Sequence, residues 1–178
     1  DSIINYWKDY AKLNYKNITL CDGSISGLYL INRLFLEKGD RVLGYVPTFS
    51  DYAADVIMHG CEYDGIVLNP ENNYKFDADE LIAALTAEHK LIYIDNPNNP
   101  TGSLYPEEVL LEIVKIAREN ELIIFSDGIY DRLVMDGILH TSTAKLAPDY
   151  PVVTFNGKDL VEVKNVIRHI KSKKKKKN

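Results

Sequence analysis

Residues 91–102 read Leu-Ile-Tyr-Ile-Asp-Asn-Pro-Asn-Asn-Pro-Thr-Gly, an apolar run of strand length that ends in a polar, turn-forming cluster. A second segment, residues 122–132, repeats this arrangement as Leu-Ile-Ile-Phe-Ser-Asp-Gly-Ile-Tyr-Asp-Arg. Short apolar runs bounded by turn residues are typical of buried strands. Each segment therefore predicts a buried strand whose carboxyl end carries polar side chains. In α/β sheets, that edge is where ligands bind.

Amphipathic stretches alternate with apolar runs along the rest of the chain, and no internal repeat or linker divides the sequence. The clearest helix is 106–120, because proline suits a first helical position and the acidic residues after it complement the helix dipole. We expect further helices at 24–36, 50–59 and 77–85, and further strands at 18–20, 41–46, 62–68 and 152–155. This alternation predicts right-handed crossovers and a mostly parallel sheet, an α/β fold with three αβα layers.

The composition is that of a globular domain. Of the 178 residues, 46% are hydrophobic and 26% are charged, which allows one domain with a sizeable core. No apolar run approaches the ~20 residues of a membrane span, and the start, Asp1-Ser2, does not resemble a signal peptide. Cys21, Cys61 and the four histidines lack metal-ligand spacing, so we expect buried free thiols and no metal site. These features predict a cytoplasmic protein without a membrane segment.

The net charge of −5 is unevenly distributed. Six lysines stand within 171–177, and without them 15 basic residues remain against 26 acidic ones, a net charge of −11. Such an acidic body is not expected to bind nucleic acid specifically. The lysine-rich end could hold RNA or an anionic membrane non-specifically. A charge run at a terminus is more typical of a solvated, disordered end, which we expect from residue 171.

Three polar groups follow the two central strands: the amide of Asn99, the carboxylate of Asp127 and the phenol of Tyr130. Together they suit a heteroaromatic cofactor that bears a ring nitrogen and a phenolic oxygen. The alternative is that Asn99 and Asp127 are only turn or cap residues after strands. That alternative is reasonable for either segment alone. It is disfavoured for both together, about thirty residues apart with a helix between them.

The two segments resemble the Asn-Pro-Thr-Gly and Asp-x-x-Tyr segments of class I/II (fold-type I) pyridoxal-phosphate aminotransferases, and the resemblance covers residues 17–157. It implies that Asn99 and Tyr130 hydrogen-bond the phenolic oxygen of the cofactor, pyridoxal 5'-phosphate. It also implies that Asp127 pairs with the ring nitrogen and raises its pKa by stabilising the charged form. A protonated ring is the better electron acceptor, which is the property that the chemistry needs.

Two further segments fit this resemblance. Residues 22–28 (Asp-Gly-Ser-Ile-Ser-Gly-Leu) form a turn that opens a helix, where backbone N–H groups can hold the cofactor phosphate at Ser24 and Ile25. Many relatives carry an acidic residue at the position of Ile25, and small-residue turns are often only turns. Residues 47–52 (Pro-Thr-Phe-Ser-Asp-Tyr) imply that Phe49 stacks on the cofactor ring and that Tyr52 lines the substrate side. Taken alone, Phe49 is more readily explained as a residue that fills the core.

The fifth segment departs from the family pattern. The family has a catalytic lysine after a strand such as 152–155, but here Lys158 stands two residues early and Leu160 occupies the lysine position. No arginine-bearing segment follows, and neither the small domain nor the N-terminal segment is recognisable. We therefore expect a partial cofactor-binding large domain at 1–157. We expect 158–178 to be an atypical end from another reading frame or an unrelated source.

The resemblance implies a homodimeric enzyme that moves an amino group between an amino acid and a 2-oxo acid. The segments look most like the group that acts on alanine, aspartate or aromatic amino acids. Histidinol-phosphate aminotransferases and related decarboxylases or lyases share them. The displaced lysine leaves a second interpretation, a non-catalytic α/β domain or truncation product that binds the cofactor without chemistry, and we expect this chain alone to be inactive. The lack of a G-x-G-x-x-G fingerprint disfavours a nucleotide-binding enzyme.

Overall fold

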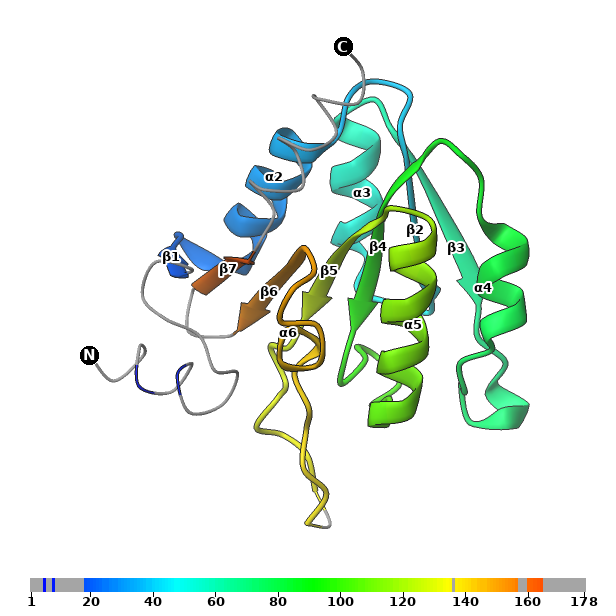
Figure 1. The fold of residues 1–178 in the computed structure, drawn as a ribbon, viewed down its shortest axis with the longest axis vertical. Helices are drawn as coiled ribbons and strands as arrows, with labels where there is room; N and C mark the ends of the chain where they lie inside the picture. The colour runs from blue at the N-terminus through cyan, green and yellow to red at the C-terminus, as the bar shows by residue number, and fades with distance from the viewer. Residues whose placement is uncertain (1–4, 6–7, 9–17, 136, 157–159, 165–178) are drawn as a thin grey trace.

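The structure is a computed structural model that describes residues 5, 8, 18–135, 137–156 and 160–164 (Figure 1). The strands are β1 (Ile18–Leu20), β2 (Arg41–Val46), β3 (Glu62–Val67), β4 (His89–Asp95), β5 (Ile123–Asp127), β6 (Val152–Asn156) and β7 (Leu160–Lys164). The helices are α2 (Gly23–Phe35), α3 (Asp51–Met58), the short 3₁₀ helix η2 (Pro70–Asn72), α4 (Ala78–Ala84), α5 (Glu107–Glu119) and α6 (Thr143–Leu146). Each helix and strand expected from the sequence is present, with ends that differ by a few residues at most.

The described strands form one sheet in the order β1-β7-β6-β5-β4-β2-β3. The pairs β2–β3, β2–β4, β4–β5 and β5–β6 are parallel, which confirms the prediction of a mostly parallel α/β sheet. The pairs β6–β7 and β1–β7 are antiparallel. We did not predict β7, although residues 161–164 alternate apolar and charged side chains, the pattern of a strand with one solvated face.

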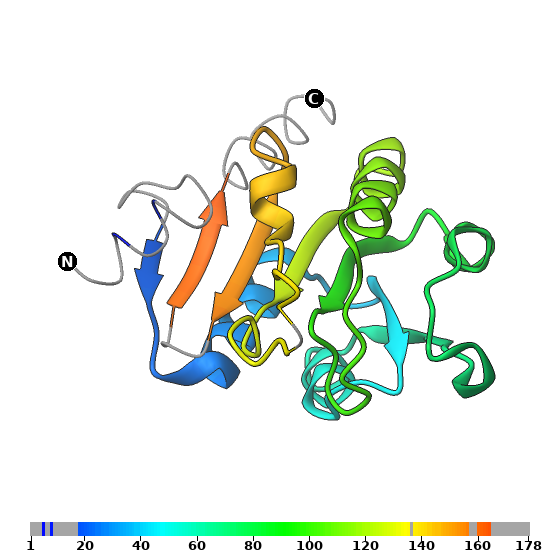
Figure 2. The ribbon, with the colours of Figure 1, turned by 90° about the horizontal axis from the view of Figure 1, so that it is seen from below.

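Helices cover both faces of the sheet, as the three-layer prediction requires. Seen from below, α2 and α3 lie on one face of the sheet and α5 and α6 on the other (Figure 2). Helix α5 turns Leu110, Ile113 and Ala117 into the core, where each is 0% exposed. Burying a leucine or isoleucine side chain contributes roughly 1.5–3 kcal/mol, so this apolar face fixes α5 on the sheet.

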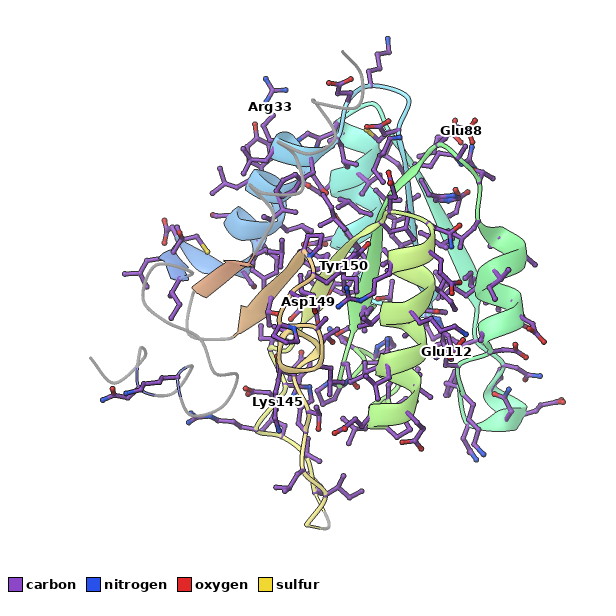
Figure 3. All side chains as sticks on the ribbon, in the orientation of Figure 1. Arg33, Glu88, Glu112, Lys145, Asp149 and Tyr150 are labelled. Atoms are coloured by element: carbon purple, nitrogen blue, oxygen red, sulfur yellow. The ribbon has the colours of Figure 1, made fainter. Side chains whose placement is uncertain are left out.

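Tyr150 ties the end of α5 to the strands beside it (Figure 3). Its hydroxyl lies 2.6 Å from the carbonyl oxygens of both Ala117 and Leu122 and can donate to either. The guanidinium of Arg118 lies 4.7 Å from the centre of the Tyr150 ring and also pairs with Asp149 at 2.6 Å. These contacts hold the start of β5 and the approach to β6 against the helix.

The carboxyl ends of β2, β4 and β5 lie at one edge of the sheet, next to the amino ends of α2, α3 and α5 (Figure 1). The loops that follow these strands therefore meet in the same region. The sequence-predicted cofactor residues lie on these loops, on helix starts or, for Asp127, at the end of a strand. Cys61 is a buried free thiol, as expected, and Cys21 is half-buried. In the part of the chain that the structure describes, no helix is long and apolar enough to cross a membrane.

Candidate cofactor-binding site

Asp127 is the last residue of β5 and the centre of the site. Its side chain is buried, with 7% of the residue exposed. The backbone N–H of Ile129 donates to Oδ1 at 2.9 Å, and the hydroxyl of Tyr52 donates to Oδ2 at 2.7 Å. Burial raises the pKa of Asp127, and these two hydrogen bonds oppose that rise by stabilising the carboxylate.

Of the two aromatic residues predicted after β2, Tyr52 contacts Asp127 directly and Phe49 packs against Tyr52. Tyr52 is 2% exposed, and burial together with the nearby Asp127 charge raises its pKa, so the phenol keeps the proton that it donates. The Phe49 ring meets the Tyr52 ring edge-on with centroids 5.6 Å apart, and it is half-buried. We expected Tyr52 to line the substrate side. The structure places its hydroxyl on Asp127 instead, and its role toward a substrate stays a prediction.

Asn99 lies on a tightly bonded loop after β4. Its backbone N–H donates to Oδ2 of Asp95 at 2.8 Å. Asn98 Oδ1 accepts from the Thr101 hydroxyl at 2.6 Å, and Asn98 Nδ2 donates to the Pro47 carbonyl at 3.3 Å. The loop is therefore fixed both to its own strand and to the loop that precedes Phe49. Sequence reasoning missed the anchoring residues Asp95 and Asn98, although aspartate and asparagine side chains commonly hydrogen-bond backbone groups of the turn that follows them.

Tyr130 lies on the turn that follows Asp127. The backbone N–H of Gly128 donates to the Phe155 carbonyl at 3.0 Å, which continues the β5–β6 pairing past the end of the strand. The N–H of Asp131 then donates to the Gly128 carbonyl at 3.0 Å and closes a turn. Tyr130 is half-buried within this turn, at the same edge of the sheet as Asp127.

The start of α2 has the features of an anion-binding helix end. Its N-cap, Asp22, makes no side-chain capping bond, and the first turn holds no acidic residue. The backbone N–H groups around Ser24 and Ile25 therefore remain available, and the helix dipole favours a negative charge there. Gly23 has a φ of +82°, a left-handed conformation that favours glycine. Ser24 is half-buried, whereas Ile25 is 58% exposed.

The candidate catalytic lysine, Lys158, lies outside the described residues, as does the lysine-rich segment. Leu160, which occupies the lysine position of the family pattern, is the first residue of β7 and pairs with Asn156 of β6 and Leu20 of β1. Residues 160–164, assigned above to an atypical end, thus continue the sheet. Among the residues that the structure describes, no group of histidine, cysteine and acidic side chains is arranged to hold a metal ion.

The model of one known protein family matches most of the chain. The model described as aminotransferase class I and II matches residues 1–158. This chain belongs to the class I and II aminotransferase family. The match begins at residue 1, so the likeness reaches further toward the N-terminus than the residues 17–157 expected from the motifs.

Curated aminotransferases resemble the chain over most of its length. It is 36% identical to the glutamate-pyruvate aminotransferase AlaA of Haemophilus influenzae, over 88% of this chain and 39% of that protein. It is 35% identical to an aspartate aminotransferase of a Bacillus species, over 86% of this chain and 40% of that protein. The chain thus spans about two fifths of the length of these relatives.

Solved aminotransferase structures confirm the fold. An aminotransferase from Escherichia coli superposes with a TM-score of 0.87 at 28% identity, covering 96% of this chain and 46% of that one. The alanine aminotransferase of Pyrococcus furiosus gives a TM-score of 0.85 at 27% identity, covering 96% of this chain and 47% of that one. The three αβα layers, with the sheet in the middle, are therefore the arrangement of the fold-type I large domain.

Proposed function

We propose that the protein to which this chain belongs is a pyridoxal-phosphate-dependent aminotransferase that moves an amino group between an amino acid and a 2-oxo acid. The observation that carries the proposal is the buried carboxylate of Asp127 at the carboxyl end of β5, held by Tyr52 and the Ile129 N–H. A carboxylate has about four acceptor positions. Asp127 uses two of them in these contacts and can accept a further hydrogen bond.

The residues present fit this cofactor. Asp127 would hold a proton on the ring nitrogen, because a carboxylate in a buried site strongly favours a neighbouring cation. Phe49 would cover the ring, and the first-turn N–H groups of α2 at Ser24 would hold the phosphate. When bound, the cofactor supplies an electron-accepting ring, which the protein itself lacks. Tyr52 keeps Asp127 oriented through its 2.7 Å hydrogen bond.

Asn99 and Tyr130 would hold the phenolic oxygen from two neighbouring loops. Asn99 is fixed by its backbone bond to Asp95, and Tyr130 follows Asp127 within one turn. An amide and a phenol can each donate to an oxygen, so the pair would set the tilt of the ring above Phe49. The loops lie at adjacent strands, because β4 and β5 are direct neighbours in the sheet.

For the substrates, the names of the relatives favour small amino acids. Relatives are named as glutamate-pyruvate, aspartate and alanine aminotransferases, and we propose an amino donor and a 2-oxo acid of this size. A homodimer is supported by the exposed apolar side chains of Leu30 and Leu34, one turn apart on α2. We place the protein in the cytoplasm, where a reducing environment keeps a thiol such as Cys61 free.

A second function, cofactor binding without amino transfer, is favoured by one observation. Leu160 stands where the family pattern has its lysine, and the pairing of β7 with β6 and β1 fixes the backbone there in a strand. A leucine can neither bond covalently to the cofactor nor move a proton. On this hypothesis the Asp127 site would still bind the cofactor.

Titration of the 178-residue chain with pyridoxal 5'-phosphate, followed by absorbance and fluorescence, tests both functions. We expect Asp127→Asn to weaken binding roughly 10- to 100-fold, because hydrogen bonds to charged groups contribute about 1.5–3 kcal/mol. Asp79→Asn, at an exposed position in the first turn of α4, is the matched control and should bind as the parent does. Equal affinity in the parent and Asp127→Asn would refute the proposed site.

Borohydride reduction of the loaded chain then separates the two functions. A lysine linked covalently to the cofactor is fixed by reduction, whereas a cofactor held only by Asp127 and its neighbours is not. The comparison is made with Lys158→Ala. Fixation that this substitution abolishes would support amino transfer through Lys158. Binding without fixation would support the second function.

A further inference from the structure

Two buried aspartates stand side by side at the carboxyl edge of the sheet. Asp95 is the last residue of β4, Asp127 is the last residue of β5, and the two are in-register partners on parallel strands. Such partners point to the same face of the sheet. The preceding partners on that face, Tyr93 and Phe125, stack with ring centroids 4.4 Å apart. Asp95 is 5% exposed and Asp127 7%, so both carboxyl groups are shielded from bulk water.

The Asp95 carboxyl also joins two loops that carry candidate cofactor residues. Its Oδ2 accepts a hydrogen bond from the backbone N–H of Asn99 at 2.8 Å. The side chain of Thr48, the neighbour of Phe49 in the loop after β2, donates to the same carboxyl group. Asp95 therefore connects the loop that presents Asn99 to the loop that presents Phe49.

We propose that Asp95 is a positioning residue that fixes these two loops around the cofactor ring and adds a second negative charge beside Asp127. The proposal rests on the proposed function of the Asp127 site. Asp95 would act through Asn99, Thr48 and Asp127, without touching a reacting atom. Two neighbouring carboxylates repel each other, and a cation beside them relieves the repulsion. A protonated ring nitrogen at Asp127 would be such a cation.

The other groups around Asp95 do not supply that cation. The titratable side chains that interact with the Asp95 charge are Tyr52 on α3, Tyr63 on β3, Tyr105 in the loop after β4 and Asp127 at the end of β5. His140, in the loop beyond β5, hydrogen-bonds the carbonyl oxygen of Asn96, the residue after Asp95. Burial raises the pKa of the three phenols, so they are neutral near pH 7. Burial lowers the pKa of His140, so its imidazole is also neutral there.

The charge of the aspartate pair therefore changes near neutral pH. Burial raises the pKa of Asp95 to about 7, and the charge of Asp127 contributes to the rise, against the opposing bonds from Asn99 and Thr48. Below this pH Asp95 is neutral, and above it Asp95 adds a negative charge beside Asp127. A protonated ring nitrogen should consequently be held more tightly as the pH rises through about 7.

The test measures the affinity of the full chain for pyridoxal 5'-phosphate from about pH 5.5 to about pH 8.5, in the parent and in Asp95→Asn. An asparagine oxygen can still accept the Asn99 N–H, so this variant removes the charge and keeps the anchor. The parent should bind roughly tenfold more tightly than Asp95→Asn at the high end, and about equally at the low end. Ionisations of the free cofactor cancel in this ratio because both proteins are measured with the same ligand.

Asp95→Ala separates positioning from charge. It removes the acceptor as well, so the backbone amide hydrogen of Asn99 should exchange with solvent at least tenfold faster than in Asp95→Asn, measured without cofactor. Asp79→Asn serves as the control for both readouts. An affinity ratio independent of pH, or Asn99 exchange unchanged in Asp95→Ala, would overturn the proposal. If the parent binds no cofactor, the proposed function fails, and the exchange of Asn99 still decides whether Asp95 positions the loop.

Discussion

Replacing Asp95 with asparagine should remove a pH-dependent loss of stability from the cofactor-free chain. Burial raises the pKa of Asp95 from 3.8 to about 7. A raised folded-state pKa means that the folded chain binds this proton more tightly than the unfolded chain does. The resulting stabilisation is complete below the unfolded pKa and is lost as the pH rises through the folded one. At about 1.4 kcal/mol per pH unit, the interval from 3.8 to about 7 corresponds to a loss of about 4 kcal/mol.

Urea unfolding of the parent and Asp95→Asn, from about pH 4 to about pH 8, measures this loss directly. The difference in unfolding free energy should shift by about 4 kcal/mol in favour of the variant as the pH rises. Asp64, whose pKa is lowered by the hydrogen bond from Arg41, titrates with the opposite sign in both proteins and cancels in the difference. The unfolding free energy of Asp79→Asn should change with pH as that of the parent does. A difference constant to within about 0.5 kcal/mol would refute the reasoning.

Two further substitutions test contacts that support the site and the fold. Tyr52→Phe removes the 2.7 Å donor to Asp127, so it should lower the unfolding free energy by about 1.5–3 kcal/mol near neutral pH and by less in acid, as read from urea unfolding at both pH values. Equal losses at the two pH values would contradict a change in the protonation of Asp127 between them. Tyr150→Phe deprives the buried Ala117 and Leu122 carbonyls of their shared donor. It should cost about 1–3 kcal/mol by thermal or urea unfolding, whereas an effect below about 0.5 kcal/mol would argue against that anchor.

Local sequence patterns were sufficient to predict the central strands and α5. The apolar runs 91–94 and 122–125 are each followed by polar, turn-forming residues. In the structure the first lies within β4, and the second forms most of β5 from Ile123 onward. The apolar face of α5 has helical spacing, and Leu110, Ile113 and Ala117 are fully buried as expected. Such patterns are decided by neighbours close in the sequence, so they can be recognised without knowledge of the fold.

The features that sequence reasoning missed depend on residues far apart in the chain. The Tyr52–Asp127 hydrogen bond joins residues 75 positions apart, on a helix and a strand in different layers. The pairing of Asp95 with Asp127 depends on the register of β4 against β5. An aspartate at the same position relative to each strand end was visible in the sequence. Only the register brings the two side chains together.

The register of β6 and β7 also could not be read from the sequence. It limits the positions from which a lysine could reach the proposed site. Phe155 is the in-register partner of Asp127, so the end of β6 lies directly beside the proposed ring-nitrogen site. The chain leaves β6 at Asn156 and enters β7 at Leu160, and these two residues pair with each other. A lysine that reaches the cofactor from this strand must therefore arise between them, which in this sequence leaves Lys158 alone.

On the proposed function, cofactor binding and covalent attachment are separable properties of this chain. Binding would depend on Asp127, on Tyr52 and on the loops anchored by Asp95, which are held in place by strands and helices with a buried core. Attachment would depend on one side chain, Lys158, which stands two residues before the family position in the sequence. Misplacement by about 1 Å already costs roughly 100-fold in rate. A geometry that retains every ring contact can thus bind the cofactor firmly and still fail to transfer an amino group.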